Sequence, residues 1–368
     1  MTIRLNRRAF MAATSSAVVA PTLISCAGRA YAQRAGELRI VSLGGGFGKA
    51  VTEAYLKPFQ AETGIKVVPI TQDLDVAQVG LMVQSKNVLV DVGLSNQASA
   101  LTLAASGHLE EVDYSIYSKD ELSAVESYSK HKNAFSSYIY STNMVYNTKK
   151  YPTGKPRPTT WAEYWDVAKF PGSRALHTGE FGSEGPWEEA LLANGVSKDA
   201  LYPIDIDRAF ASLDRIKPHV RKWWTNGSEV LQIMRDNVAD IVQSYDGRAL
   251  SLVDAGEPLE INRNQAKLTW DYWYILKGSP NAGNAQKFIE FTSRPGPQAE
   301  FARLYAQAPS NRNAYKLLTE TVAKKLATYP DYLAGSFPLN VSWYNEVGKD
   351  GLSNRQRLAQ RWNEWILR

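Results

Sequence analysis

The stretch LRIVSLGGGFG, residues 38–48, decides the fold of this chain. Its first six residues are mostly apolar and predict a short strand, and the three consecutive glycines that follow predict a turn. Apolar residues then recur at helical spacing from Val51 to Phe59, and Gly64 suits the left-handed conformation that ends a helix. IKVVPI, residues 65–70, predicts the next strand. This segment is therefore a strand–helix–strand unit.

Strands and helices continue to alternate beyond this unit, which predicts an α/β protein with a mainly parallel sheet. We expect a helix over residues 76–83 and a buried strand over 88–94, which together complete a first lobe. The run from Ala134 to Tyr146 is rich in aromatic and β-branched residues and is expected to carry the chain out of that lobe. An aromatic strand over 268–276 is expected to bring the chain back.

A second lobe is expected between these two crossings. The three prolines within residues 152–158 exclude a helix near its start. The expected elements of this lobe are strands over 175–178 and 239–244 and helices over 186–194, 206–216 and 230–237. After the second crossing we expect helices over 285–292, 296–306 and 314–328, packed on the first lobe, and a closing amphipathic helix over 354–367. The predicted division is 34–140 plus 273–368 for the first lobe and 141–272 for the second.

Residues 1–33 have the composition of an export signal. Arg7 and Arg8 precede an apolar run that extends to about Ile24, and the Ala30-Tyr31-Ala32 stretch is a pattern that a signal peptidase cuts. Paired arginines at this position are typical of a twin-arginine (Tat) signal. We therefore expect an exported, periplasmic protein.

Cys26, the only cysteine of the chain, leaves an alternative open. LISC, residues 23–26, also fits a lipobox, in which Cys26 would carry a lipid anchor. Cleavage after Ala32 would instead leave a mature chain that cannot form a disulfide, although its compartment would permit one.

The net charge of +5 belongs mostly to the N-terminal segment. Residues 1–33 contain four arginines and no acid, so the rest of the chain carries 38 basic against 37 acidic residues. A nearly neutral mature chain argues against nucleic-acid binding, which usually shows a dense basic patch. No later stretch approaches the roughly 20 apolar residues of a membrane span.

From residue 38 onward the sequence resembles the bacterial extracellular solute-binding proteins, and within them the spermidine/putrescine-binding branch of ABC importers. The resemblance is carried by the glycine turn and the helix that ends in FQAETGIKV (59–67), and by NMVYN (143–147), PTTWAEYW (158–165), WTNGS (224–228) and DIVQSYDGR (240–248). It implies a type II periplasmic-binding fold, with two α/β lobes, a hinge of crossing strands and a ligand cleft. It also implies a monomeric, non-enzymatic receptor that delivers a small amine-containing or zwitterionic solute to the membrane permease of an ABC importer. Members of the family also bind phosphonates and iron.

Ligands of open α/β sheets bind beyond the carboxyl ends of the strands, and this rule selects the candidate residues. Gly45, Gly46 and Phe47 follow the first strand, where glycines let backbone N–H groups approach an anion. The turn does not match a dinucleotide or P-loop motif, so we expect no nucleotide cofactor. The other candidate ligand-binding residues are Asn96, Tyr138, Tyr140, Glu180, Phe181, Trp224, Tyr245, Asp246, Arg248, Trp270 and Asp271.

Asp271 and Arg248 carry the expected ligand chemistry. The resemblance implies an aspartate beside an aromatic residue that contacts the amine, and Asp271 lies at that place next to Trp270. A carboxylate and an aromatic face both stabilise an ammonium group. Arg248 would pair with a carboxylate or phosphonate and favour a zwitterion, unless it pairs with Asp246 instead. Structural roles are also open: core packing for Trp270, and helix capping or solvent exposure for Glu180.

Two further functions stay open. A ferric-iron receptor would need clustered tyrosines, and Tyr138, Tyr140 and Tyr245 make that conceivable. A secreted hydrolase is less supported, because the four histidines are scattered and no G-x-S-x-G motif occurs. A carboxylate pair such as Glu180 and Glu184 would be needed for glycoside hydrolysis, and nothing in the sequence fixes the geometry of that pair. We expect neither a metal site nor an enzyme.

Overall fold

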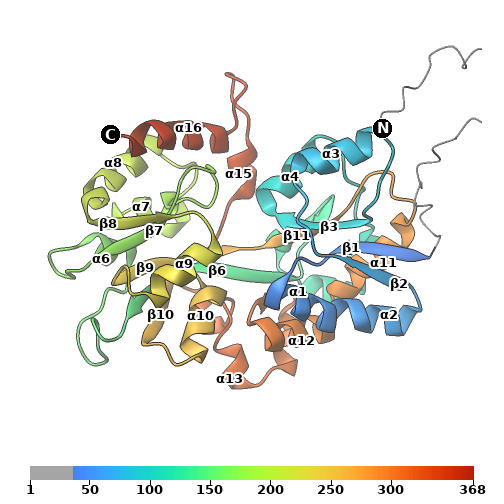
Figure 1. Cartoon of the computed structure of the whole chain (residues 1–368), viewed down its shortest axis with the longest axis horizontal. Coiled ribbons are helices and arrows are strands. Elements are labelled where there is room, and N and C mark those ends of the chain that lie inside the picture. The colour runs from blue at the N-terminus through green and yellow to red at the C-terminus, as the bar shows by residue number, and fades with distance from the viewer. Residues whose placement is uncertain (1–35) are drawn as a thin grey trace, which may run out of the picture. The chain divides into compact units, whose positions relative to one another are not determined.

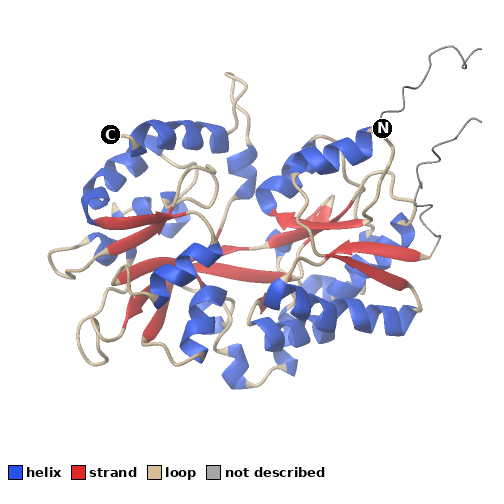
Figure 2. Ribbon diagram, viewed as in Figure 1, coloured by secondary structure: helices blue, strands red, loops and turns tan. Residues whose placement is uncertain are grey.

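Two β-sheets organise residues 36–368, the part of the chain that the computed structural model describes (Figures 1 and 2). The first sheet and its helices form lobe 1, residues 36–137 and 271–311, and the second sheet and its helices form lobe 2, residues 140–269 and 330–368. Within residues 36–368, no helix is both long and apolar enough to cross a membrane.

Lobe 1 is built on the predicted strand–helix–strand unit. Its strands, in spatial order, are β2 (Lys66–Ile70), β1 (Glu37–Val41), β3 (Val92–Asn96), β11 (Asp271–Ile275), β5 (Ala134–Phe135) and β4 (Lys130–His131). β1 pairs in parallel with β2 and β3, as expected for strands joined by helices. Leu38 and Ile40 of β1 are fully buried. The first helical segment ends at Gly64, whose φ of 69° is left-handed, which confirms that prediction.

Helices lie on both sides of the lobe 1 sheet (Figure 1). They are α1 (Gly45–Val51), a π-helical turn (Thr52–Leu56), α2 (Lys57–Thr63), α3 (Val76–Gln84), α4 (Gln97–Ala105), α5 (Lys119–Ala124), α11 (Ala282–Thr292) and α12 (Pro295–Tyr305), with 3-10 turns at Tyr114–Ile116 and Ser127–Ser129. The predicted helices over 76–83, 285–292 and 296–306 are confirmed by α3, α11 and α12.

Lobe 2 is built on the second sheet. Its strands, in spatial order, are β13 (Phe337–Pro338), β10 (Leu259–Thr269), β6 (Tyr138–Asn147), β9 (Ile241–Tyr245), β7 (Arg174–His177) and β8 (Val220–Trp224), and β12 (Ala308–Pro309) pairs with the start of β6. Its helices are α6 (Trp161–Trp165), α7 (Trp187–Ala193), α8 (Ile206–Ile216), α9 (Gly227–Arg235), α10 (Asp246–Asp254), α14 (Pro330–Leu333), α15 (Val341–Asn345) and α16 (Asn354–Ile366), with 3-10 turns at Lys198–Ala200 and Lys217–His219.

Two strands carry the chain between the lobes side by side. β6 pairs with β12 at Tyr138 and Ile139 and enters the second sheet at Tyr140, whose backbone partner is Thr269, the last residue of β10. The chain then returns to lobe 1 as β11, whose first residue, Asp271, pairs with Asn96 of β3. This geometry confirms the predicted hinge of crossing strands. It also places Asp271 immediately after the crossing.

The assignment of all of residues 273–368 to lobe 1 is wrong, because the chain crosses a third time. β13 pairs with β10 in lobe 2, and α16 packs on the same lobe. The Trp362 ring of α16 lies 5.8 Å from Trp187 and 5.0 Å from Trp223. An apolar helix stripe shows that a helix packs on something, but it does not show which lobe it packs on.

Three other predicted elements differ from the structure. The expected helix over 314–328 is a 3-10 turn (Arg312–Leu317) followed by the short α13 (Glu320–Ala323), because the Thr319 side chain caps a new helix start. The expected strand over 88–94 begins only at Val92, since the Asp91 carboxylate accepts the backbone N–H of Arg39. The expected single strand over 268–276 is broken at Trp270.

Candidate functional site

Asp271 presents a carboxylate at the crossing between the lobes. The Tyr138 hydroxyl donates to its Oδ2 at 2.7 Å, and the Tyr140 hydroxyl donates to its Oδ1 at 3.2 Å. Both tyrosines come from β6, and their hydroxyls converge on one carboxylate because β6 and β11 adjoin at the hinge. Within residues 36–368 no cationic side chain forms an ion pair with Asp271. Burial raises the pKa of Asp271, and the two tyrosine hydroxyls oppose that rise.

Glu184 presents a second carboxylate from lobe 2. The Tyr245 hydroxyl, at the end of β9, donates to its Oε2 at 3.0 Å. Glu184 sits in a left-handed backbone conformation, with φ of 60°, in the loop after β7. Such a conformation is uncommon for a residue with a side chain, and it costs free energy that the surrounding structure must offset. Burial and the neighbouring Asp271 raise the pKa of Glu184 to about 7.

Tyrosine rings connect the two carboxylates. The Tyr140 and Tyr245 ring centroids are 5.7 Å apart in an edge-on arrangement, and each hydroxyl donates to a different carboxylate. The phenols of Tyr140 and Tyr245 each have their pKa raised well above the usual value, by burial and then by these carboxylates. Both hydroxyls therefore stay protonated and remain hydrogen-bond donors.

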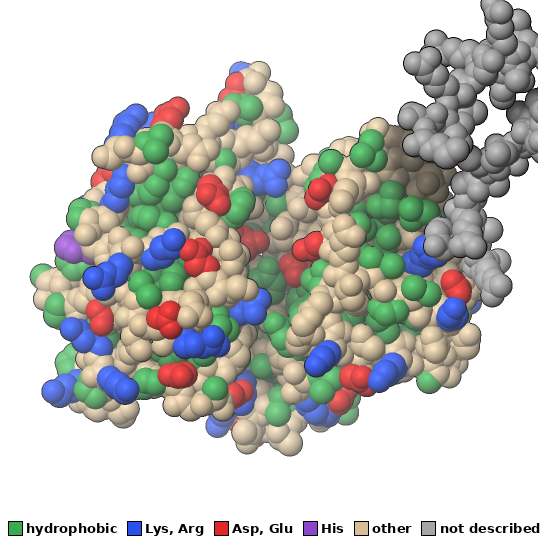
Figure 3. Space-filling view, viewed as in Figure 1, with side chains coloured by type: hydrophobic (Ala, Val, Ile, Leu, Met, Phe, Trp, Pro, Cys, Tyr) green, Lys and Arg blue, Asp and Glu red, His purple; other side chains and the backbone are tan. Residues whose placement is uncertain are grey.

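A cavity of about 250 Å³ opens beside Glu184. It is lined by Asn96, His177, Phe181, Ser183, Glu184, Thr225 and Tyr245, so lobe 1 contributes Asn96 and lobe 2 the rest. Figure 3 shows the surface hollowed between the two lobes, with acidic side chains along the hollow. No lysine or arginine is among the described residues that line this cavity. Glu184 gives this wall a carboxyl group that can accept hydrogen bonds from a bound cation.

His177 is a neutral member of the cavity wall. Its Nδ1 lies 2.7 Å from the carbonyl of Thr178, which can only accept, so Nδ1 carries the proton and Nε2 is left as an acceptor. Burial, with a smaller effect from the positive charge of Lys267, lowers the pKa of His177 to about 3. Sequence reasoning missed His177, because a lone histidine in a strand carries no spacing signal.

Trp224 and Trp270, both predicted to bind ligand, are buried in the core. Trp224 is fully buried, donates its indole N–H to the carbonyl of Gln243, and packs against the rings of His177 and Tyr245. Trp270 is 2% exposed and packs on Tyr128, with ring centroids 4.8 Å apart. Trp224 therefore packs against two side chains of the cavity wall, whereas Trp270 packs away from that wall.

Asp246 and Arg248 have different surroundings, although both follow β9. The Asp246 carboxylate is buried, accepts a hydrogen bond from the Ser141 hydroxyl at 3.0 Å and pairs with Arg263 at 3.2 Å. These contacts give Asp246 a structural role. The Arg248 guanidinium forms no hydrogen bond or ion pair with any other residue in 36–368. It packs beside Gly227 at the start of α9, where an added Cβ would meet its Nε at 2.6 Å. Arg248 is therefore available to a ligand.

The remaining predicted residues divide between the cleft and its surroundings. Phe47 packs edge-on against Tyr138 at 5.5 Å, which brings it near Asp271, whereas Gly45 lines a separate hollow on lobe 1. Gly46 packs near Tyr305. Glu180 is exposed, and Phe181, with 52% of its surface exposed, lies at the cavity mouth.

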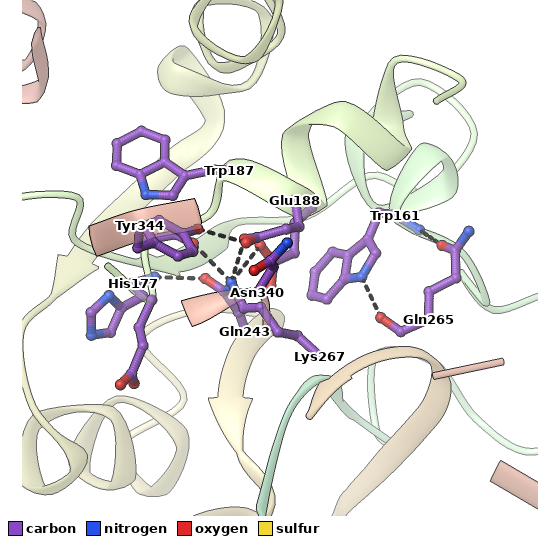
Figure 4. Close-up of polar contacts among 12 residues, drawn as sticks. Trp161, His177, Trp187, Glu188, Gln243, Gln265, Lys267, Asn340 and Tyr344 are labelled. Carbon is purple, nitrogen blue, oxygen red and sulfur yellow. Dashed lines mark hydrogen bonds and ion pairs between the residues drawn. The ribbon is translucent and has the colours of Figure 1, made fainter. Parts of the chain in front are cut away.

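A buried ion network, whose members Lys267, Glu188 and Tyr344 are drawn in Figure 4, contacts the segment that follows Glu184. Lys267 Nζ, on β10, lies 2.9 Å from Glu188 Oε2 and 3.0 Å from Glu189 Oε2, and it donates to the carbonyl of Gly185 at 2.9 Å. The Tyr344 hydroxyl, on α15, donates to Glu188 Oε1 at 2.6 Å. Since Gly185 follows Glu184 directly, this network fixes the backbone next to the second carboxylate.

Comparisons with known proteins show which family this chain belongs to. The sequence matches the family of bacterial extracellular solute-binding proteins over residues 54–331. The chain belongs to this family. It is a substrate-binding component of an ABC transporter, and its extracellular family places it outside the cytoplasm.

Individual relatives of this solute-binding protein are moderately similar along nearly their whole length. A gamma-aminobutyric acid-binding protein of Pseudomonas aeruginosa is 31% identical over 338 residues, which cover 90% of this chain and 91% of the relative. The crystal structure of an ABC transporter substrate-binding protein from Bradyrhizobium japonicum USDA 110 is 28% identical, with a TM-score of 0.81, and covers 90% of this chain and 100% of its own. The structure of the Atu4243-GABA receptor is 28% identical, with a TM-score of 0.77, and the match covers 89% of this chain and 97% of that receptor chain.

Proposed function

We propose that this solute-binding protein captures a small zwitterion with a protonated primary amine, and that gamma-aminobutyric acid (GABA) is its best candidate ligand. The observation that carries the proposal is a pair of partly buried carboxylates: Glu184 lies in the wall of a cavity with no lysine or arginine in its described wall, and Asp271 lies at the crossing between the lobes. Charge-assisted hydrogen bonds to an ammonium would satisfy both acids. The GABA-binding relatives support this ligand class.

The anionic end of the ligand has a matching group in Arg248. Its guanidinium is without a partner among residues 36–368; it sits beside Gly227, outside the cavity wall itself, and its charge acts on Tyr245 of that wall. A guanidinium binds a carboxylate through two parallel hydrogen bonds. A ligand held by Asp271 and Glu184 at one end and Arg248 at the other would be an amino acid with separated charges.

Polyamines are the competing ligand class. Putrescine could place one ammonium at Asp271 and the other at Glu184, and then Arg248 would have no role in recognition. The spermidine/putrescine branch therefore remains a proposal for this chain.

Ferric-iron binding and hydrolysis have weaker support. For ferric iron, Tyr138, Tyr140 and Tyr245 would have to lose their protons, yet each donates to a carboxylate and has a raised pKa. Residues 36–368 contain no group of three histidine, cysteine or acidic side chains suited to a metal. A secreted hydrolase would need a catalytic carboxylate pair, but Glu180 is exposed and apart from the cavity wall.

Export and assembly complete the proposal. We infer that residues 1–33, which lie outside the described residues, direct twin-arginine export, with cleavage after Ala32 or lipid attachment at Cys26 as the two routes. The mature protein acts as a monomer without affinity for nucleic acid. Its lobes close on the ligand about the Tyr140 and Thr269 crossing, and the closed form delivers the ligand to the permease.

A thermal-shift panel tests the ligand class directly. The exported protein is mixed with GABA, putrescine, spermidine and ferric iron, because a ligand that binds the folded state raises its melting temperature. A rise with GABA and none with the polyamines supports the zwitterion. A rise with putrescine or spermidine alone would replace GABA with a polyamine, and a rise with iron alone would remove the amine site.

A further inference from the structure

Glu184 lines the cavity from lobe 2, and Asp271 begins β11 of lobe 1; the two acids are linked through the hydroxyls of Tyr245 and Tyr140, whose ring centroids are 5.7 Å apart. The negative charge of Asp271 acts directly on Glu184, and both charges act on Tyr140, which lies between them. Each acid has tyrosine hydroxyls as its hydrogen-bond donors, which stabilise a carboxylate but do not neutralise it. Two partly buried acids that are linked in this way, with no cation paired to either within residues 36–368, oppose each other's ionisation.

The charged groups around Glu184 in the described part of the chain do not supply that cation. Lys267, on β10, acts favourably on Glu184, but its ammonium is already paired with Glu188 and Glu189 of α7. Glu188 itself acts unfavourably on Glu184. His177, on β7, is neutral, and Arg248, on α10, acts on Tyr245 and forms no ion pair with Glu184. Asp73, in the loop after β2, adds another negative charge near Asp271.

We propose that Glu184 carries a proton in the ligand-free cleft and releases it to solvent when the ligand's ammonium group binds between Glu184 and Asp271. The proton leaves the Glu184 carboxyl, and the ammonium keeps its own three protons. The inference rests on the proposed capture of a cationic amine. Ligand capture is then an exchange of positive charges: the ligand's ammonium group enters the cleft as the proton leaves Glu184.

The burial that opposes ionisation of Glu184 supports this exchange, since it raises the pKa of Glu184 to about 7 in the ligand-free protein. A bound ammonium would lower that pKa toward or below its usual value of about 4.3. The amine of GABA, with a pKa near the value of about 10.4 for lysine, stays protonated between pH 6 and 8. Any proton released in that range therefore comes from the protein.

Isothermal titration calorimetry with GABA tests the exchange. At each pH the binding enthalpy is measured in phosphate and in Tris, whose ionisation enthalpies differ, so the difference gives the number of protons released. We expect close to one proton per ligand near pH 6, about half near pH 7 and nearly none near pH 9. Between pH 6 and 8 the apparent affinity should rise about tenfold.

Two matched variants locate the proton. Glu184→Gln keeps an acceptor for the Tyr245 hydroxyl but cannot ionise, so it should bind GABA through Asp271 with no proton release and no pH dependence of affinity. Glu180→Gln, which removes an exposed acid four residues away, should release protons like the wild type. Wild-type binding of GABA without proton release at pH 6, or equal release by Glu184→Gln, would overturn the exchange.

A ligand-free measurement separates this inference from the proposed function. The ¹³C carboxyl resonance of Glu184, assigned by its absence in Glu184→Gln, should titrate near pH 7 in the free protein. If it does and GABA does not bind, the ligand proposal fails while the proton site stands. Titration near pH 4 would overturn the proton site whether or not GABA binds.

Discussion

The rings of Tyr140 and Tyr245 meet edge-on with centroids 5.7 Å apart, and their hydroxyls donate to Asp271 and Glu184 respectively. Tyr140 lies on the strand that crosses between the lobes, whereas Tyr245 ends β9 of lobe 2. The contact therefore joins the hinge to the second carboxylate. A ligand ammonium between these acids would stabilise the arrangement in which the two tyrosines touch.

Replacing Arg248 tests whether the ligand has an anionic end. Arg248→Gln removes the guanidinium without breaking an ion pair within residues 36–368, so the fold should be unaffected. We expect GABA affinity to fall about 10-fold to 100-fold, in line with about 1.5–3 kcal/mol for hydrogen bonds to a charged group. Calorimetric titration of the variant and the wild type with GABA and with putrescine measures the affinity for each ligand. Equal affinity of the variant and the wild type for GABA would remove Arg248 from the site.

Replacing Tyr245 tests the hydrogen bond that favours ionised Glu184. Tyr245→Phe keeps the ring against Trp224 but removes the donor to Glu184, so the pKa of Glu184 should rise further. The pH at which GABA affinity reaches its plateau should therefore move upward relative to the wild type. An unchanged pH profile of affinity would show that this hydroxyl does not act on Glu184.

Replacing Lys267 tests the buried ion network that contacts the segment after Glu184. Lys267→Met leaves Glu188 and Glu189 buried without their cation, and breaking such a buried pair costs about 3–5 kcal/mol of unfolding free energy. Chemical denaturation gives that value. The matched control is Lys277→Met, whose pair with Glu110 is exposed and contributes at most about 1 kcal/mol. Equal losses for the two variants would contradict the role assigned to Lys267.

The stability of the ligand-free protein should depend on Glu184 in a defined direction. Its pKa is raised in the folded state to about 7, so the stability that protonation contributes is full below the unfolded pKa of about 4.3 and is lost as the pH rises through 7. Wild type and Glu184→Gln should have similar melting temperatures at pH 4. At pH 8 the variant should be more stable by about 2–4 kcal/mol. A constant difference across this range would exclude the raised pKa.

The strand–helix–strand unit and the hinge were predictable because they depend on local signals. Periodic apolar residues and Gly64 define the first helical segment, and the aromatic residues around Asp271 mark the return to lobe 1. The third crossing was not predictable, since the stripe of Leu358, Trp362 and Trp365 fits either lobe equally well.

Part of the candidate site was also predictable. The rule that ligands bind at strand ends selected Tyr140, Tyr245 and Asp271, which the structure brings together. It could not distinguish Glu184 from Glu180, because only the fold shows which acid of that loop turns inward. It also missed Lys267, whose acidic partners are 78 and 79 residues away in the sequence.

The most direct test of the amine site is a calorimetric titration of GABA into the wild type, Asp271→Asn and the control Glu180→Gln. Asparagine keeps the size of the side chain and removes its charge, and its amide oxygen still accepts from one of the two tyrosine hydroxyls. We predict micromolar or tighter binding by the wild type and Glu180→Gln, which corresponds to at least about 8 kcal/mol, and a loss of 10-fold or more for Asp271→Asn. GABA binding of equal affinity by all three proteins would contradict the assignment of Asp271 to the ligand's ammonium group.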